Sequence, residues 1–133
     1  MYHNFTESGS IAGVGIDTTD ISRFQRMREN IRMRLAKRIL GETEYKMYIS
    51  DPFPEKRLAV FFSAKESVAK ALGTGFQGIA FRDILISYDS MHCPCVYLSE
   101  RAGKIAEKRG IRTIHLSITH EGPLVTVISV AAK

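Results

Sequence analysis

The sequence predicts a protein of the α+β class, and three observations lead to this prediction. The chain has 133 residues, of which 44% are hydrophobic and 25% charged, the proportions of one soluble globular domain. Both helical and strand-like hydrophobic periods occur along it. Predicted helices and strands follow one another without the repeating strand–helix–strand rhythm of a parallel sheet, which favours α+β over α/β.

The N-terminal part begins with a short strand and a basic helix. Residues 11–17 (IAGVGID) predict a strand that ends on a carboxylate. Thr18 and Thr19 are expected to cap the following helix, and Gly41 to end it. Between them, apolar residues recur at steps of three and four. This stretch therefore predicts one continuous amphipathic helix with a single apolar stripe.

The remaining elements are predicted from local patterns and turn residues. Residues 42–50 predict one or two helical turns before prolines at positions 52 and 54 impose an extended loop. A second long helix is expected from about residue 55 to residue 72, ended by Gly73 and Gly75. The later elements are a hairpin of strands at 81–87 and 95–98, a helix that follows a Ser99 cap and closes at Gly110, and strands at 111–119 and 124–131.

The sequence shows no sign of a membrane or secreted protein. No window approaches the roughly 20 apolar residues of a membrane span. The polar start MYHNFTESGS lacks the basic-then-apolar layout of a signal peptide. We therefore expect a cytoplasmic protein, with residues 1–10 as an N-terminal extension and residues 11–133 as one domain. Cys93 and Cys95 indicate neither a disulfide framework nor a zinc site, so both thiols are expected to be reduced.

Positive charge is concentrated in one stretch of the chain. The formal net charge of the whole chain is +5. Residues 23–38 contain seven lysines and arginines and a single acid, Glu29. Such a surface would attract nucleic acid, an anionic membrane or an acidic protein, and composition does not choose among them. The alternative is a solvated helix face without a partner.

The second long helix carries polar side chains that are candidates for a functional site. Successive helical residues turn by about 100°, which places Lys65 in the middle of an apolar stripe and gathers Ser63, Glu66 and Lys70 along its edge. Taken alone, Glu66 and Lys70 also fit an ordinary surface pair, and Lys65 fits a side chain that extends along the surface to reach water. The apolar stripe consists of Leu58, Phe61, Phe62, Ala69 and Leu72.

Three segments match the pattern of a known family in order and spacing. They are VGID at 14–17, FFSAKESVAKALGTG at 61–75 and SITH at 117–120. A glycine-hydrophobe-aspartate strand followed by a phenylalanine-containing helix ending KEA..KA.G resembles the holo-[acyl-carrier-protein] synthases of the 4′-phosphopantetheinyl transferase superfamily. The resemblance runs from about residue 11 to the C-terminus. Ser67 departs from the usual alanine, and Phe61 stands where some relatives carry a basic residue.

The resemblance implies helices packed on a small, mainly antiparallel sheet, and a Mg²⁺-dependent transfer. The phosphopantetheine arm of coenzyme A would pass to a serine of an apo acyl carrier protein, releasing adenosine 3′,5′-bisphosphate, in support of fatty acid biosynthesis. Asp17 and Glu66 would bind the metal, and Lys70 would stabilise the leaving phosphate. Glu66 would also act as the base, either directly or through a metal-bound water. Coenzyme A would contact Lys65, Lys70, Gly73, Gly75, His115 and Ser117. The family precedent is a homotrimer with active sites at its interfaces.

A carrier protein gives the basic stretch a partner, because acyl carrier proteins are small and acidic. The residues expected to dock it are Arg23, Met27, Arg28, Arg32 and Arg34. Two other functions remain as alternatives. A nucleic-acid-binding module leaves the spacing of Asp17, Glu66 and Lys70 unexplained, and a non-catalytic protein that binds carrier or coenzyme A would not need both carboxylates.

Overall fold

The computed structural model describes residues 1–5 and 9–133 and confirms the α+β class. Three strands form one antiparallel sheet in the order β1-β5-β4, and two more form a separate antiparallel pair, β2-β3. The strands are β1 (Ile11–Asp20), β2 (Ile84–Tyr88), β3 (Pro94–Leu98), β4 (Thr113–Glu121) and β5 (Leu124–Ala132). The helices are α1 (Ser22–Gln25), α2 (Glu29–Ile39), α3 (Glu42–Ser50), α4 (Pro54–Leu72), the 3₁₀ helix η1 (Phe81–Asp83) and α5 (Glu100–Lys108).

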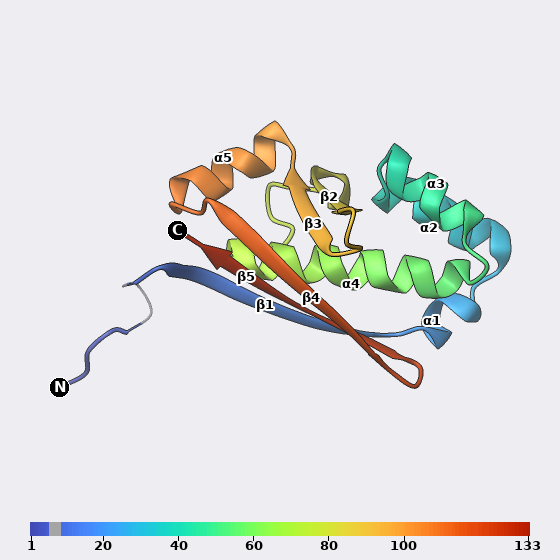
Figure 1. Cartoon of the computed structure of the whole chain (residues 1–133), viewed down its shortest axis with the longest axis horizontal. Helices are drawn as coiled ribbons and strands as arrows, with labels where there is room; N and C mark the ends of the chain where they lie inside the picture. Colours follow the sequence, from blue (N-terminus) through green and yellow to red (C-terminus); the bar gives the residue numbers. More distant parts are fainter. Residues whose placement is uncertain (6–8) are drawn as a thin grey trace.

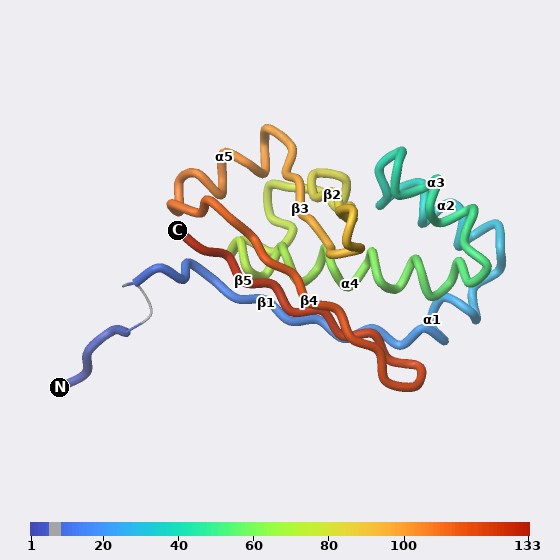
Figure 2. The backbone as a smooth tube through the Cα atoms, in the orientation of Figure 1, coloured from blue at the N-terminus to red at the C-terminus, as the bar shows by residue number. Residues whose placement is uncertain are grey.

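Helix α4 is the centre of the molecule. Its long axis crosses one face of the three-stranded sheet, while α2, α3, α5 and the β2-β3 pair lie on the other side of the helix (Figure 1). The backbone path shows the C-terminus beside the start of β1 (Figure 2), where the Lys133 nitrogen donates to the Ser10 carbonyl at 2.8 Å. Each helix of the described residues is too short or too polar to cross a membrane. Helix α4 lies between the sheet and the outer elements, and both pack on it to form the core.

Two glycines let β1 approach α4 closely. Gly13 and Gly15 lie on the strand face turned toward the helix. A Cβ at Gly15 would lie 1.9 Å from the Ser67 carbonyl oxygen, and one at Gly13 would lie 2.2 Å from that of Ala71. The buried Ser67 hydroxyl donates to the Gly15 carbonyl at 3.1 Å and pairs with the Ser129 hydroxyl at 2.6 Å. The serine that departs from the family pattern thus bonds across this contact.

The predicted N-terminal cap is wrong. Strand β1 continues through Thr18 and Thr19 to Asp20. Thr19 is buried, with its hydroxyl 2.5 Å from that of Ser63 on α4, so the side chain serves a tertiary contact and not a helix end. Asp20 instead accepts a hydrogen bond from the Ser22 nitrogen at 2.9 Å.

The basic stretch is two helices and not one. Helix α1 ends at Gln25, and Arg28 is extended, with φ −61° and ψ 142°, before α2 begins. The two helices bury different residues: α1 buries Phe24, whereas α2 buries Ala36 and Ile39. Ile31, which the continuous stripe would have buried, is exposed. The break lets both segments pack on the core.

The later elements follow the predictions within a few residues. Ser99 caps α5 by accepting a hydrogen bond from the Ala102 nitrogen at 3.2 Å. The strand expected at 81–87 starts as η1 before continuing as β2, and β4 extends to Glu121. Cys93 and Cys95 are free, Cys93 exposed and Cys95 partly buried.

On the face of the sheet turned away from α4, β1 and β5 expose an apolar patch. On β1, Val14 and Ile16 are 63% and 58% exposed. They pair with Val130 and Ile128 of β5, and Ile128 is exposed as well. A contiguous apolar surface of this kind is typical of a protein–protein contact.

We predict that Gly15→Ala lowers the free energy of unfolding by at least about 2 kcal/mol, because the new methyl group would overlap the helix backbone. The matched control is Gly103→Ala in α5, where a Cβ would meet nothing within 4 Å. That substitution should raise stability by about 0.5–1 kcal/mol, since alanine loses less entropy in a helix. Urea unfolding measures both changes, and an unchanged midpoint for Gly15→Ala would contradict the close packing.

Candidate active site

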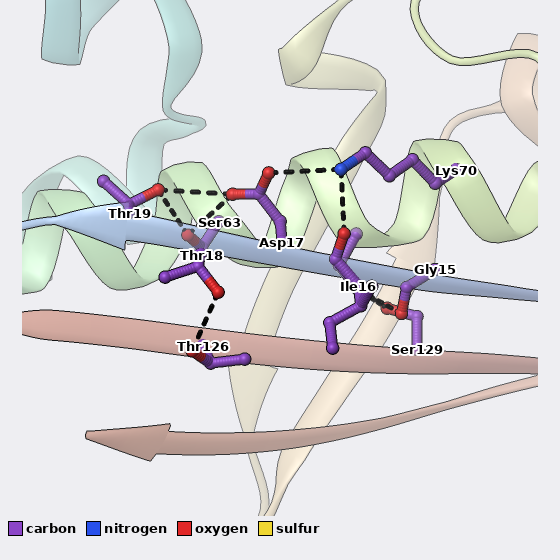
Figure 3. Close-up of polar contacts among 10 residues, drawn as sticks. Gly15, Ile16, Asp17, Thr18, Thr19, Ser63, Lys70, Thr126 and Ser129 are labelled. Carbon is purple, nitrogen blue, oxygen red and sulfur yellow. Dashed lines mark hydrogen bonds and ion pairs between the residues drawn. The ribbon is translucent and has the colours of Figure 1, made fainter. Parts of the chain in front are cut away.

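Asp17 lies on the same face of β1 as the two glycines and points at α4. Its Oδ2 accepts a hydrogen bond from the Ser63 hydroxyl at 2.8 Å and another from the Thr19 hydroxyl at 3.2 Å. Figure 3 shows the Thr19 contact within β1 and the Ser63 contact from β1 to α4. The two hydroxyls fix the orientation of the carboxylate.

Lys70 reaches the same carboxylate from the next turns of α4. Its ammonium donates to the Ile16 carbonyl at 2.8 Å and lies 3.4 Å from Asp17 Oδ1 (Figure 3). The Lys70 side chain is 50% exposed. Its charge is thus positioned by the strand yet remains open to a ligand.

Glu66 completes the group one turn before Lys70. Burial raises the pKa of the Glu66 carboxyl, and the negative charge of Asp17 raises it further, while Lys70 and Arg23 oppose the shift. Arg23 belongs to α1, where its guanidinium lies 4.9 Å from the centre of the Phe62 ring. The structure therefore brings the predicted Asp17, Glu66 and Lys70 together, with Arg23 at the border of the site.

Lys65 is not part of this group, and the expectation that it contacts the nucleotide is wrong. Its side chain is 0% exposed and lies 2.7 Å from Glu44 Oε1, in the core between α3 and α4. Burial lowers the pKa of Lys65, and the carboxylate of Glu44 opposes that shift. Glu44 is the partner that sequence reasoning missed. Glu44 follows Arg38-Ile39-Leu40 as a further match to the family pattern, but no sequence pattern links it to Lys65.

The two glycines after α4 differ in what surrounds them. Gly73 ends the helix at φ 83°, and a Cβ there would lie 2.1 Å from a guanidinium nitrogen of Arg109. Arg109 itself donates to the Leu72 carbonyl at 2.6 Å. Gly75 also has a positive φ, but open space surrounds its Cβ position. Both positions therefore favour glycine through their positive φ, and the open space at Gly75 also leaves room for a ligand.

His115 and Ser117 lie away from the carboxylates. They are exposed residues of β4 on the sheet face opposite α4, and β5 separates β4 from β1. Ser117 borders a pocket of about 500 Å³ that also contains Lys56, Arg57 and His120, but Asp17, Glu66 and Lys70 do not line it. Within one chain these two residues cannot share a small ligand with the carboxylates.

Comparison with known proteins decides the family. Residues 13–124 match the family described as the 4′-phosphopantetheinyl transferase superfamily. The chain belongs to this superfamily. It is 35% identical over 113 residues to the holo-[acyl-carrier-protein] synthase of Serratia proteamaculans and 36% identical to that of Yersinia pestis, covering 84% of this chain and 90% of each relative.

Solved structures of the superfamily share the fold. The holo-[acyl-carrier-protein] synthase of Neisseria meningitidis superposes with a TM-score of 0.85 at 34% identity, covering 92% of this chain and 99% of that one. The Helicobacter pylori enzyme, crystallised in complex with coenzyme A, gives a TM-score of 0.76 at 26% identity, over 89% and 98% of the two chains. The resemblance seen in the sequence is thus confirmed.

The residues expected to form a docking surface in this transferase fold separate into two groups. Arg23, Arg28 and Arg34 are exposed, and Met27 is partly buried against the core. Arg32 is only 9% exposed, and its expected place on an open docking face is wrong. Its guanidinium donates to the Tyr48 hydroxyl at 3.0 Å and pairs with Glu55 at 3.1 Å, so it joins α2 to α3 and α4.

The donor set fits a magnesium ion. Among the described residues no group of three or more His, Cys, Asp or Glu side chains could hold a metal. Mg²⁺ commonly takes only one or two carboxylates and completes its shell with phosphate and water. Asp17 and Glu66 are two hard oxygen donors, and the negative charge of Asp17 adds to the burial that raises the pKa of Glu66. A divalent cation between them would relieve that repulsion.

We predict opposite shifts of the Glu66 pKa in two variants of the metal-free protein. Asp17→Asn removes a negative neighbour and should lower the pKa, whereas Lys70→Ala removes a positive one and should raise it. Asp20→Asn, on the opposite face of β1, is the control and should leave the value unchanged. An NMR titration of the Glu66 carboxyl carbon measures all three. A rise in Asp17→Asn would show that the two carboxylates do not share a site.

Proposed function

We propose that this chain transfers the 4′-phosphopantetheine group of coenzyme A to a serine hydroxyl of an apo acyl carrier protein, with Mg²⁺, and releases adenosine 3′,5′-bisphosphate. The observation that carries the proposal is the convergence of Asp17, Glu66 and Lys70 in a chain 35% identical to a holo-[acyl-carrier-protein] synthase over 113 residues. The protein would act in the cytoplasm and supply fatty acid biosynthesis.

The site residues suit this reaction. The serine oxygen attacks the phosphorus that carries the pantetheine arm, and the bond to the bridging oxygen breaks, so that its electron pair leaves with the bisphosphate. Mg²⁺, held by Asp17 and Glu66, would neutralise the pyrophosphate charge. Glu66 takes the serine proton. Lys70, oriented by the Ile16 carbonyl, stabilises charge on the leaving phosphate.

The exposed apolar sheet face supports a homotrimer with active sites between subunits. Val14, Ile16 and Ile128 would be covered by a second copy of the chain. His115 and Ser117 lie on this same face, where contact with a neighbouring chain would bring them to coenzyme A bound beside that chain's Lys70. The separation of these residues within one chain is then explained.

Exposed arginines beside the carboxylates support docking of the acidic carrier. Arg23 borders the site, and Arg28 and Arg34 continue the positive surface along α2. Long-range attraction of this kind raises association rates and selects orientation more than it raises final affinity. Met27 would add an adaptable apolar contact.

Transfer is tested by incubating the protein with coenzyme A, Mg²⁺ and an apo carrier protein and weighing the carrier by mass spectrometry. Wild type should add the phosphopantetheine mass, and removal of Mg²⁺ should stop the reaction. Asp17→Ala and Glu66→Ala should each lose at least about 10²-fold in kcat, because the transferring phosphate loses charge stabilisation. Glu107→Ala, an exposed acid of α5, is the control. Near wild-type turnover by either site variant would refute the metal assignment.

The docking surface is tested by reversing exposed charges. Arg28→Glu with Arg34→Glu should lower kcat/KM for the carrier about tenfold at low salt and flatten its dependence on ionic strength. Lys108→Glu with Arg112→Glu, near the end of α5, matches the change in charge and should leave the slope intact. Steady-state rates across a salt series give the comparison. A slope equal to that of wild type would place carrier docking on another face.

The assembly is tested at the apolar sheet face. Ile128→Glu should shift the protein to a monomer in analytical ultracentrifugation and abolish transfer, because a buried interface would have to accept an unpaired charge. Ile49→Glu replaces another exposed isoleucine, on α3, and should change neither property. A fully active Ile128→Glu monomer would show that one chain holds a complete site.

A further inference from the structure

Lys65 and Glu44 form an ion pair enclosed in the core, one residue before Glu66. Both side chains are 0% exposed, and Lys65 Nζ lies 2.7 Å from Glu44 Oε1. The ammonium also donates to the carbonyl of Ile39 at 2.8 Å and to that of Phe81 at 3.1 Å. An ammonium has three donors and no acceptor, so these contacts use its full capacity.

Glu44 extends the pair to the main chain of two further segments. Its Oε1 accepts a hydrogen bond from the Gly41 nitrogen at 2.7 Å, and its Oε2 accepts one from the Ile86 nitrogen at 2.8 Å. The pair therefore joins the end of α2, the start of α3, η1 and β2 to one point on α4. Every contact is directional, and together they restrict how these segments sit on the helix.

The contact with Ile39 holds the helix proposed to dock the carrier. Ile39 is the last residue of α2, and carbonyls in the last turn of a helix have no partner inside it. Lys65 supplies that partner, and its positive charge meets the negative end of the helix dipole. Arg34 lies on this helix and Arg28 immediately precedes it. The orientation of both arginines thus depends on a lysine of α4.

The contact with Phe81 holds an aromatic stack beside the carboxylates. The Phe81 ring stacks on Phe62, with centroids 5.4 Å apart, and on Phe76 at 4.0 Å. Phe62 lies one helical turn before Glu66 on α4. Because Lys65 fixes the main chain of Phe81, it also limits where this stack can lie next to Glu66.

We propose that the Lys65–Glu44 pair is a positioning device that fixes α2 and the Phe81 turn relative to Asp17 and Glu66. The inference rests on the proposed function, since it concerns where a carrier serine meets those carboxylates. Stability alone gives no reason for a charged pair here, because burying two charges is costly and apolar side chains of similar size are often as stable. Directional bonds to four segments set a geometry that apolar packing leaves free.

Two variants separate positioning from stability. Lys65→Met leaves the Glu44 carboxylate buried without its partner and should lower the melting temperature. Adding Glu44→Gln removes the second charge and should restore much of that loss. Activity should not return with it: kcat with the carrier should stay on the order of 10²-fold below wild type in both variants, the scale expected for a misplaced reacting group. The KM for coenzyme A should be unchanged.

Hydrogen exchange measures how firmly α2 is held, independently of the transfer reaction. Amides at the end of α2 should exchange faster in both variants than in wild type. The control is Ile111→Ala, a core substitution between α5 and β4 that should lower the melting temperature without changing kcat or exchange in α2. If Lys65→Met proves too unstable to assay, the double variant carries the test.

The proposal is overturned if kcat recovers together with the melting temperature in the double variant, or if Lys65→Met is as active as wild type. It is also overturned if Ile111→Ala loses as much activity for the same loss of stability. A wild-type protein that leaves the carrier unmodified would instead refute the proposed function. The exchange comparison would then still decide whether Lys65 holds α2 on α4.

Discussion

The packing of α4 against the glycine face of β1 is the contact on which the candidate site depends. Gly13 and Gly15 leave no side chain between strand and helix, and a Cβ at either would overlap the helix backbone. Asp17 comes next on the same face, so the close approach brings its carboxylate to Ser63 and Lys70. A wider separation would break both contacts. The two glycines therefore decide which polar groups surround the Asp17 carboxylate.

Helix α4 uses different faces for different purposes. The edge that faces β1 carries Ser63, Glu66 and Lys70, which remain within reach of solvent or of Asp17. Lys65 is adjacent to Glu66 in sequence but is turned by about 100° around the helix axis. That rotation carries its charge from the open edge into the core, where Glu44 meets it. Neighbouring charged residues therefore have unrelated environments.

Local sequence patterns correctly predicted the features of the fold that depend on interactions between residues close in sequence. The long helix was expected at 55–72 and runs over Pro54–Leu72, and Ser99 caps α5, because periodicity and capping depend on residues close in sequence. The errors over Thr19 and Arg32 involve distant partners. Thr19 bonds to Ser63 and Arg32 to Tyr48, and each partner lies on a different element from the residue that it contacts. No spacing rule connects such pairs.

Among the site residues, too, some positions were predicted correctly and one depends on a distant partner. Asp17, Glu66 and Lys70 were predicted together from the family pattern, and the structure places them together. Lys65 belongs to the same motif, yet its environment depends on Glu44, which lies 21 residues away on another helix. A motif records which residues recur, and it does not distinguish one that would face a ligand from one that holds the fold.

Strand β1 links the candidate site to the proposed subunit interface through its alternation. Gly15 and Asp17 face α4, while Val14 and Ile16 face outward and are exposed. A shift of the strand by one residue would exchange these two sets, since side chains alternate between the faces of a sheet. It would drive Val14 and Ile16 into the helix and turn Asp17 away from Ser63. The register that packs β1 on α4 is therefore the same one that leaves the apolar residues exposed for the proposed second chain.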